Sequence, residues 1–77
     1  MASTTHQQNP VPALIRISQV HRLTGLSNSA IYRGVQSGTF PRPLKLTERS
    51  SAWVETEVLE WIAARIAERD KASSRAA

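Results

Sequence analysis

The side chains best suited to chemistry lie between residues 27 and 36, and they form hydrogen bonds rather than catalyse reactions. Ile31 and Val35 stand four residues apart and can form the buried face of a helix. The other side of this helix displays polar groups at Asn28, Ser29, Tyr32, Arg33 and Gln36. Arginine can pair bidentately with guanine, asparagine or glutamine can pair with adenine, and hydroxyls can reach phosphate oxygens. This face therefore predicts contact with a DNA groove.

The distribution of charge favours the same partner. The 77-residue chain has a net charge of +4, and its positive charge is concentrated in the middle. Between Leu14 and Trp53 the only acidic residue is Glu48, against the basic residues Arg16, Arg22, Arg33, Arg42, Lys45 and Arg49. An ordinary helix with a solvated polar face is the alternative interpretation, but such a face is normally richer in Glu and Lys. The absence of acids from Ser18 to Leu46 favours a polyanion.

A second basic segment follows the first. Residues 44–46 and 52–54 are apolar-bearing runs around a five-residue polar stretch, a pattern that predicts a β-hairpin with its tip at 47–51. We expect this hairpin to lie along the phosphate backbone as a wing, although a solvent-exposed turn can carry the same residue types. The candidate wing contacts are Arg42, Lys45, Thr47, Arg49, Ser50 and Ser51.

Two short helices are expected to position the first set of polar residues. Alternation around Arg16 predicts a short strand at Ile15 and Ile17, after which Ser18 is expected to cap a helix over 19–24. Gly25 ends this helix, and Ser27 provides an N-cap for a second helix over 28–37. Two helices joined by so tight a turn predict a helix-turn-helix unit, in which the second helix enters the major groove.

The remaining elements complete a small core. Gly38 is expected at the C-terminal end of the second helix, and Pro41 and Pro43 prevent its continuation. A third helix is predicted over 56–70, with one apolar face. That face consists of Val58, Leu59, Ile62 and Ile66. Ile31 and Val35 are expected to be buried with Val20, Leu23 and Leu26. Phe40 and Trp53 are expected to attach the hairpin to the core. Trp61 is predicted either to fill the core edge or to meet another protein.

These elements make one domain over residues 14–71, mainly α with a small β-hairpin: a winged helix-turn-helix of three helices and a two-stranded wing. Residues 1–13 are expected to be a disordered tail and residues 72–77 a flexible one. The chain contains no cysteine and no apolar run long enough to span a bilayer. We therefore expect a soluble protein of the bacterial cytoplasm, associated with the nucleoid and not with a membrane.

Several of these segments, taken in order, resemble the AlpA family of phage-type regulators. The resemblance runs from about Leu14 to Asp70, through "LTGLSNSAIYRGVQSGTFPRPLKL" and "AWVETEVLEWIAARIAERD". Its most specific parts are Thr24-Gly25-Leu26-Ser27, Ile31-Tyr32-Arg33, the stretch from Gly38 to Pro43, and Trp53 with Val58 and Trp61. The family is related in fold to excisionases and to the DNA-binding domain of MerR-type regulators.

The resemblance implies a winged helix-turn-helix with recognition residues from Ser27 to Arg33 and a wing between Leu44 and Trp53. It also implies a role for an integrated element, either as a transcription regulator of integrase and excision genes or as an excisionase that bends attachment-site DNA, a recombination directionality factor. Two residues depart from the pattern. Gly34 replaces a larger apolar residue at a cost of about 1 kcal/mol in helix propensity relative to Ala, and Glu48 puts an acid on the wing tip.

Other functional classes are less well supported. His6 and His21 have no cysteine or carboxylate constellation around them, so neither an enzyme nor a cofactor is expected. A protein-interaction module that docks through Trp61 and the last helix on an integrase, or on another DNA-bound protein, is the alternative. Both roles can coexist, because one recognition helix makes few contacts unless copies bind cooperatively, head to tail, on double-stranded DNA. A tyrosine or serine integrase is a further expected partner.

Overall fold

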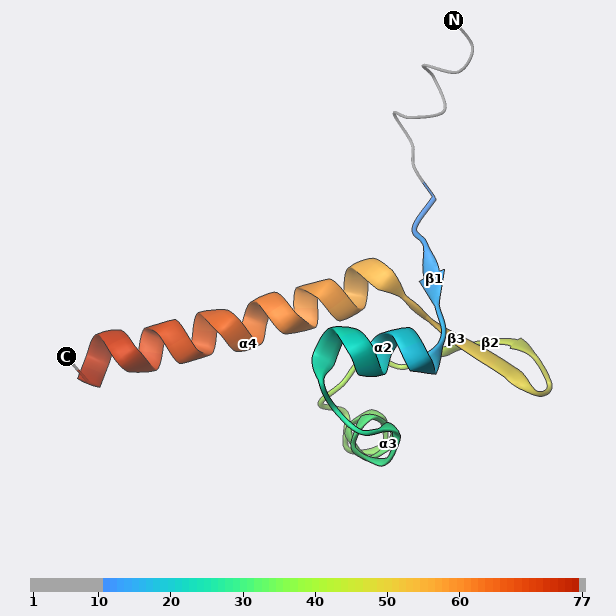
Figure 1. Cartoon of the computed structure of the whole chain (residues 1–77), viewed down its shortest axis with the longest axis horizontal. Helices are drawn as coiled ribbons and strands as arrows, with labels where there is room; N and C mark the ends of the chain where they lie inside the picture. The colour runs from blue at the N-terminus through green and yellow to red at the C-terminus, as the bar shows by residue number, and fades with distance from the viewer. Residues whose placement is uncertain (1–10, 77) are drawn as a thin grey trace, which may run out of the picture.

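The computed structural model describes residues 11–76 of the chain. In this range the chain forms three helices and a small antiparallel sheet, in the order β1 (Leu14–Ile15), α2 (Ile17–Thr24), α3 (Asn28–Ser37), β2 (Leu44–Thr47), β3 (Ser50–Val54) and α4 (Glu55–Ala76). The β2–β3 hairpin and α4 extend in opposite directions from α2 and α3 (Figure 1). The expected winged helix-turn-helix is confirmed.

The start of α2 differs from its prediction. Ser18 does not cap the helix, which begins at Ile17 with Arg16 in the N-cap position and without a side-chain cap. The backbone of Arg16 is extended, and its carbonyl oxygen accepts hydrogen bonds from the amides of Gln19 and Val20 at 2.9 and 3.0 Å. Ile17 packs against the core from this helical position. Burial of Ile17, rather than a polar cap, therefore fixes where α2 begins.

The turn and α3 have the predicted boundaries. Gly25 adopts a φ of 75° and ends α2, in the left-handed region that glycine enters without a steric penalty. The Ser27 hydroxyl oxygen accepts a hydrogen bond of 3.1 Å from the amide of Ala30, as an N-cap should. Gly38, with a φ of 80°, ends α3. Because each of these signals is local, the sequence alone was sufficient to place both ends of α3.

The sheet is larger, and its hairpin tighter, than expected. The strand predicted around Arg16 covers only Leu14–Ile15 and pairs with β3, giving the strand order β1-β3-β2. The tip is not five residues long: Ser50 and Ser51 belong to β3, and the strands turn at Glu48 and Arg49. A bulge between Lys45 and Thr47 shifts the register of β2 against β3. It lets the turn close earlier than the polar stretch suggested.

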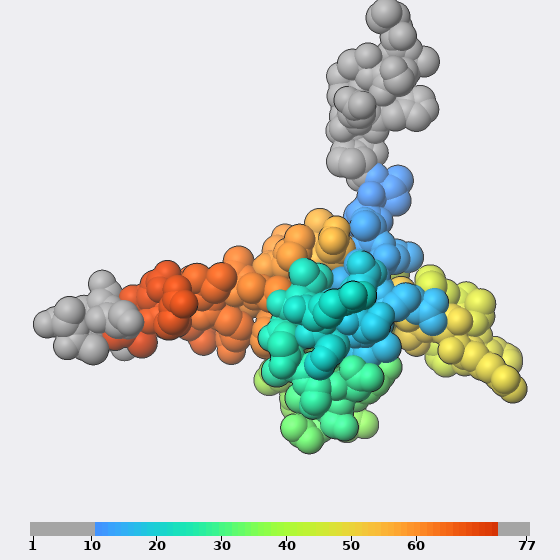
Figure 2. Space-filling model, in the orientation of Figure 1, coloured from blue at the N-terminus to red at the C-terminus, as the bar shows by residue number. Residues whose placement is uncertain are grey.

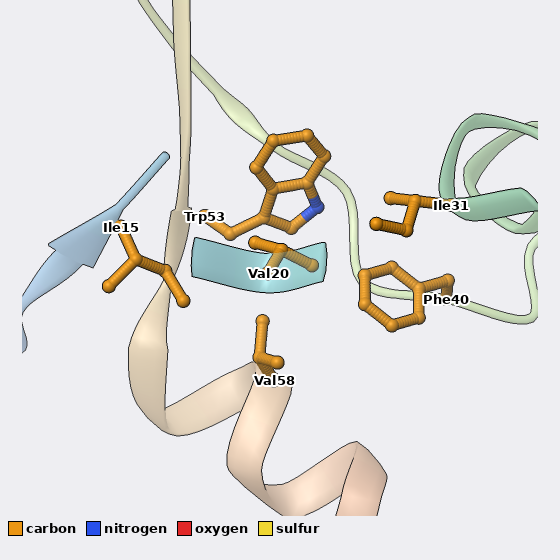
Figure 3. Close-up of a cluster of buried hydrophobic side chains, with 6 residues drawn as sticks. All are labelled: Ile15, Val20, Ile31, Phe40, Trp53 and Val58. Atoms are coloured by element: carbon orange, nitrogen blue, oxygen red, sulfur yellow. The ribbon is translucent and has the colours of Figure 1, made fainter. Parts of the chain in front are cut away.

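The core lies where α2, α3 and β3 meet the first turns of α4. It is formed by Ile15, Val20, Ile31, Phe40, Trp53 and Val58, with Val20 between Trp53 and Val58 (Figure 3). Phe40 and Trp53 are buried, which confirms that they attach the hairpin to the core. Trp61 lies partly buried at the core edge. Leu26, Val35 and Ile62 also pack there.

Three apolar residues expected in the core are not buried. Leu23 is 42% exposed, Leu59 is 44% exposed and Ile66 is 46% exposed. The helix α4 starts at Glu55, one residue earlier than predicted, and continues to Ala76 rather than to Asp70. It projects beyond the core (Figure 1), so its later turns have no partner in the described chain. Helical periodicity identified the apolar side of α4 but not how much of it meets another element.

Gly34, the departure from the family pattern, has a steric explanation. A Cβ atom built on Gly34 would lie 2.9 Å from Phe40 Cβ, closer than such atoms approach in real structures. The chain turns back here, and the amides of Thr39 and Phe40 both donate to the carbonyl oxygen of Gly34 at 2.9 and 3.1 Å. The small residue therefore allows the segment after α3 to return against the helix.

The two predicted tails differ in how they relate to the described structure. Residues 1–10, most of the predicted N-terminal tail, and residue 77 lie outside the described residues, while residues 72–76 of the predicted C-terminal tail belong to α4. Ala13 accepts a hydrogen bond from the amide of Glu55 at 2.8 Å, next to the β1–β3 pair. No helix in the described range is both long and apolar enough to cross a membrane.

Candidate nucleic-acid interface

The polar residues predicted on the second helix all lie on the exposed surface of α3 or at its N-terminus. Ser27, Asn28, Ser29, Tyr32, Arg33 and Gln36 are each exposed, whereas Ile31 is fully buried. Ser29, Arg33 and Gln36 follow each other at spacings of four and three residues, so they share one face of the helix. This face carries a guanidinium, an amide and a hydroxyl that no core residue covers.

Tyr32 lies on the flank of α3 that faces the sheet. Its ring centroid is 5.9 Å from that of Trp53 with the rings tilted by 56°, and the residue remains 47% exposed. Trp53 is fully buried, so the tyrosine ring packs against a residue of the core. Ser27 has a structural task as well, because its oxygen caps α3; the hydroxyl proton remains available as a donor.

The predicted wing residues divide into two groups. Arg42, Lys45, Thr47 and Arg49 are exposed, whereas Ser50 and Ser51 are half-buried within β3 rather than on a flexible tip. At the tip, the Lys45 ammonium donates to the backbone carbonyl of Glu48 at 3.1 Å, and the Arg49 amide donates to the Thr47 hydroxyl at 3.3 Å. The hairpin thus presents two exposed cations, Lys45 and Arg49, beside one exposed acid, Glu48, and Arg42 lies just before β2.

Two tryptophans hold the segment that links α3 to the wing. Trp53 Nε1 donates to the carbonyl oxygen of Pro41 at 2.9 Å, and Trp61 Nε1 donates to that of Thr39 at 2.7 Å. The rings of Phe40 and Trp61 meet edge to face, with centroids 4.9 Å apart. The residue types alone had predicted both indoles as apolar groups and not as hydrogen-bond donors to these carbonyls. The signal was available, because a buried indole N–H usually needs an acceptor.

The cations of α3 and the wing do not have acidic partners among the described residues. Within residues 11–76, the ion pairs lie on α4, between Arg65 and Glu68 at 3.0 Å and between Arg69 and Asp70 at 2.9 Å. Arg33 and Arg49 are therefore exposed cations outside these ion pairs, although Glu48 is the chain neighbour of Arg49. Such groups retain their full charge for an anionic ligand.

The structure places His21 in a structural position. This residue is exposed, and its Nδ1 lies 2.6 Å from the carbonyl oxygen of Leu26, so it ties α2 to the turn before α3. No group of three or more His, Cys, Asp or Glu side chains within the described range could hold a metal ion.

Comparison with known proteins identifies the family of the chain. Residues 13–66 match the family model described as "Prophage CP4-57 regulatory protein (AlpA)". The chain is also similar to "Uncharacterized protein ORF88" of Enterobacteria phage P4, with 40% identity over 57 residues. This second match covers 74% of the chain and 65% of the phage P4 protein. The family match includes α2, α3, the hairpin and the first half of α4.

Proposed function

Because the chain belongs to the AlpA family of prophage regulatory proteins, we propose that it is a sequence-specific DNA-binding regulator of a mobile genetic element and not an enzyme. The observation that carries the proposal is the exposed, acid-free face of α3 next to a projecting hairpin. Figure 2 shows this hairpin extending from the body formed by α2 and α3. A helix that carries Arg, Gln and Ser outward suits the major groove, where base edges offer acceptors and donors.

We assign different tasks to the two surfaces. Ser29, Arg33 and Gln36 share the outward face of α3 and are placed to read base edges, while Asn28 and Tyr32 flank them. Arg42, Lys45 and Arg49 of the wing provide positive charge for phosphates. Thr47 supports the tip through its bond to Arg49, and the half-buried Ser50 and Ser51 contribute to the strand more than to the DNA surface. Phosphate contacts fix orientation, and base contacts give specificity.

The regulated event is either excision of the element or transcription of its integrase gene. A family of prophage regulatory proteins accommodates both tasks, and in both the protein acts at the DNA of the host nucleoid. Footprinting on the element's own attachment site and on its integrase promoter separates them. Protection of the attachment site alone supports an excisionase, a recombination directionality factor, and protection of the promoter alone supports a transcription regulator.

Substitution of one arginine from each surface tests the DNA-binding proposal. If Arg33 contacts a base, Arg33→Ala should cost about 1–3 kcal/mol of binding free energy at the target site and relax sequence preference. Arg49→Ala should weaken binding to all sequences and reduce the slope of log affinity against log salt by about one. Both are measured by titration of target and random duplexes over a range of salt concentrations. Equal effects of the two variants on both duplexes would contradict this assignment.

A contact with an integrase is a second candidate role, and α4 favours it. Leu59 and Ile66 lie on this helix and are nearly half exposed, and neither packs against the core of the described chain. Paired Leu59→Ser and Ile66→Ser substitutions should leave binding of the isolated protein to DNA unchanged and reduce co-assembly with the element's tyrosine or serine integrase on attachment-site DNA. A double variant that still assembles normally with the integrase would exclude this face of α4.

A further inference from the structure

An open groove of about 670 Å³ lies between α3 and the first turns of α4, on the flank of α3 opposite the Tyr32–Trp53 contact. Leu26, Phe40 and Trp61 supply its apolar lining. Its polar lining comes from the last two turns of α3 and the residue pair that follows: Arg33, Gln36, Ser37 and Thr39. The Arg33 guanidinium has N–H donors for a phosphate, whereas the hydroxyls of Ser37 and Thr39 already bond to each other and to the carbonyl oxygen of Gly34.

Trp61 divides two hollows of opposite charge. The groove on the Arg33 side has no acidic residue in its lining. The neighbouring hollow, also bordered by Thr39, Phe40 and Trp61, is lined by Glu57 and Glu60. A polyanion is therefore attracted to the first hollow and repelled from the second. This difference selects the Arg33 side as the one that a phosphate backbone can occupy.

Arg65 adds a cation beside Trp61, the residue that the two hollows share. Its guanidinium carbon lies 5.5 Å from the centre of the Trp61 ring, a cation–π contact that holds the group beside the tryptophan. The same guanidinium pairs with Glu68, but both side chains are more than half exposed, and such pairs contribute little in water. Arg65 therefore retains donors for another anion, since a guanidinium has five N–H groups.

We propose that this groove binds one sugar–phosphate strand of the DNA, with Arg65 beside Trp61 as a phosphate contact at the edge of the groove, in addition to the contacts of α3 and the wing. The inference rests on the proposed function and extends it. A helix in the major groove has one backbone strand along each flank. The wing serves the flank on the side of Tyr32, and the groove beside Trp61 serves the other flank. The binding surface then extends from the hairpin across α3 to α4.

A matched pair of substitutions on α4 tests the proposal. Arg65→Gln and Arg69→Gln remove the same charge one turn apart, and both arginines are exposed and paired with an acid on the same helix. Only Arg65 lies beside Trp61. With a mixed-sequence DNA duplex, Arg65→Gln should weaken binding about three- to tenfold at low salt and lower the salt slope by about one, whereas Arg69→Gln should leave the slope unchanged.

Equal effects of Arg65→Gln and Arg69→Gln would overturn the groove assignment while leaving the proposed function intact, provided that Arg49→Ala still reduces the salt slope. Absence of salt-dependent binding by the unmodified protein would overturn both. Circular dichroism of each variant checks that its fold is retained.

Fluorescence quenching provides an independent measurement on the unmodified protein. Trp53 is fully buried and Trp61 is only partly buried, so quenching by acrylamide reports mainly on Trp61. A strand in the groove should lower the quenching constant when the protein is saturated with the mixed-sequence duplex. An unchanged quenching constant at saturation would overturn the proposal, because DNA would then be bound elsewhere.

Discussion

At position 34, helix propensity and tertiary packing favour different residues. In an exposed helix, alanine in place of glycine normally stabilises by about 1 kcal/mol. Here the added methyl group would lie 2.9 Å from Phe40 Cβ, an atom near the backbone that cannot rotate away. The backbone after α3 would have to move, and with it Phe40, a core residue. Sterics therefore outweigh helix propensity at this position.

We predict that Gly34→Ala destabilises the domain. Overpacking typically costs about 1–3 kcal/mol, and the gain in propensity offsets about 1 kcal/mol of it. The expected net loss is about 1 kcal/mol, which lowers the melting temperature by about 4–8 °C in a domain of this size. Thermal unfolding followed by circular dichroism measures it. Gln36→Ala, on the exposed face of the same helix, is the control and should leave the melting temperature nearly unchanged; an increase for Gly34→Ala would contradict the steric argument.

Individual residues were predictable from sequence where their role is local. Gly25, Ser27 and Gly38 each act on the backbone within a few residues, and all three have the expected roles. The role of Gly34 depends on how the chain returns after α3, and the exposure of Leu23 depends on which elements reach α2. Neither property is encoded in the neighbouring residues. The same distinction applies to the candidate site, since periodicity placed Ser29, Arg33 and Gln36 together while the contact between Tyr32 and Trp53 needed the tertiary structure.

At the scale of elements, the link between α3 and the wing is held from two sides. Trp53 of β3 and Trp61 of α4 donate to the carbonyl oxygens of Pro41 and Thr39, so the segment between α3 and the hairpin is bonded to both the sheet and the last helix. The prolines of this segment predicted that α3 would not continue through it, but not that the segment is anchored. Side-chain to backbone bonds over 12 and 22 residues are long-range features that local patterns do not reveal.

The anchor predicts an effect of Trp61→Phe. Phenylalanine retains an aromatic ring for the edge-to-face contact with Phe40 but removes the N–H donor to Thr39. Loss of one such bond should lower the free energy of unfolding by about 1 kcal/mol, as measured by urea denaturation. Leu59→Ala on the same helix removes an exposed side chain and should have a smaller effect. Similar losses for the two variants would show that the indole bond adds no specific stability.

The hairpin and sheet also show the limit of pattern reading for elements. Alternating apolar residues located both strands of the wing, whereas the polar residues Ser50 and Ser51 concealed the start of β3. The short β1 was expected from Ile15, but its pairing with β3 was not, because pairing joins residues 14–15 to residues 53–54. Helix α4 likewise continues past Ile66, its last large apolar residue, to Ala76. Its extent follows from good helix formers rather than from burial.

At the scale of the whole molecule, the surface that we propose for DNA consists of one helix, α3, and one hairpin beside a core of six buried side chains in the described range. Such a module makes few base contacts, and selective binding usually requires more buried surface than one module provides. Copies of the protein bound side by side would supply it. Contacts between unlike surfaces of neighbouring copies do not close into a ring, so they continue along the DNA as long as sites are available.

This arrangement predicts cooperative binding. On a duplex with several adjacent target sites, the protein should bind each site more tightly than on a duplex with one site, and the Hill slope should exceed one. Band-shift titrations of the two duplexes at equal salt measure both quantities. A duplex in which the sites are separated by an added half helical turn is the control, because it preserves the base contacts of each copy while placing neighbours on opposite faces of the DNA. Equal affinity per site on all three duplexes, with a Hill slope of one, would mean that the domain binds as an independent unit.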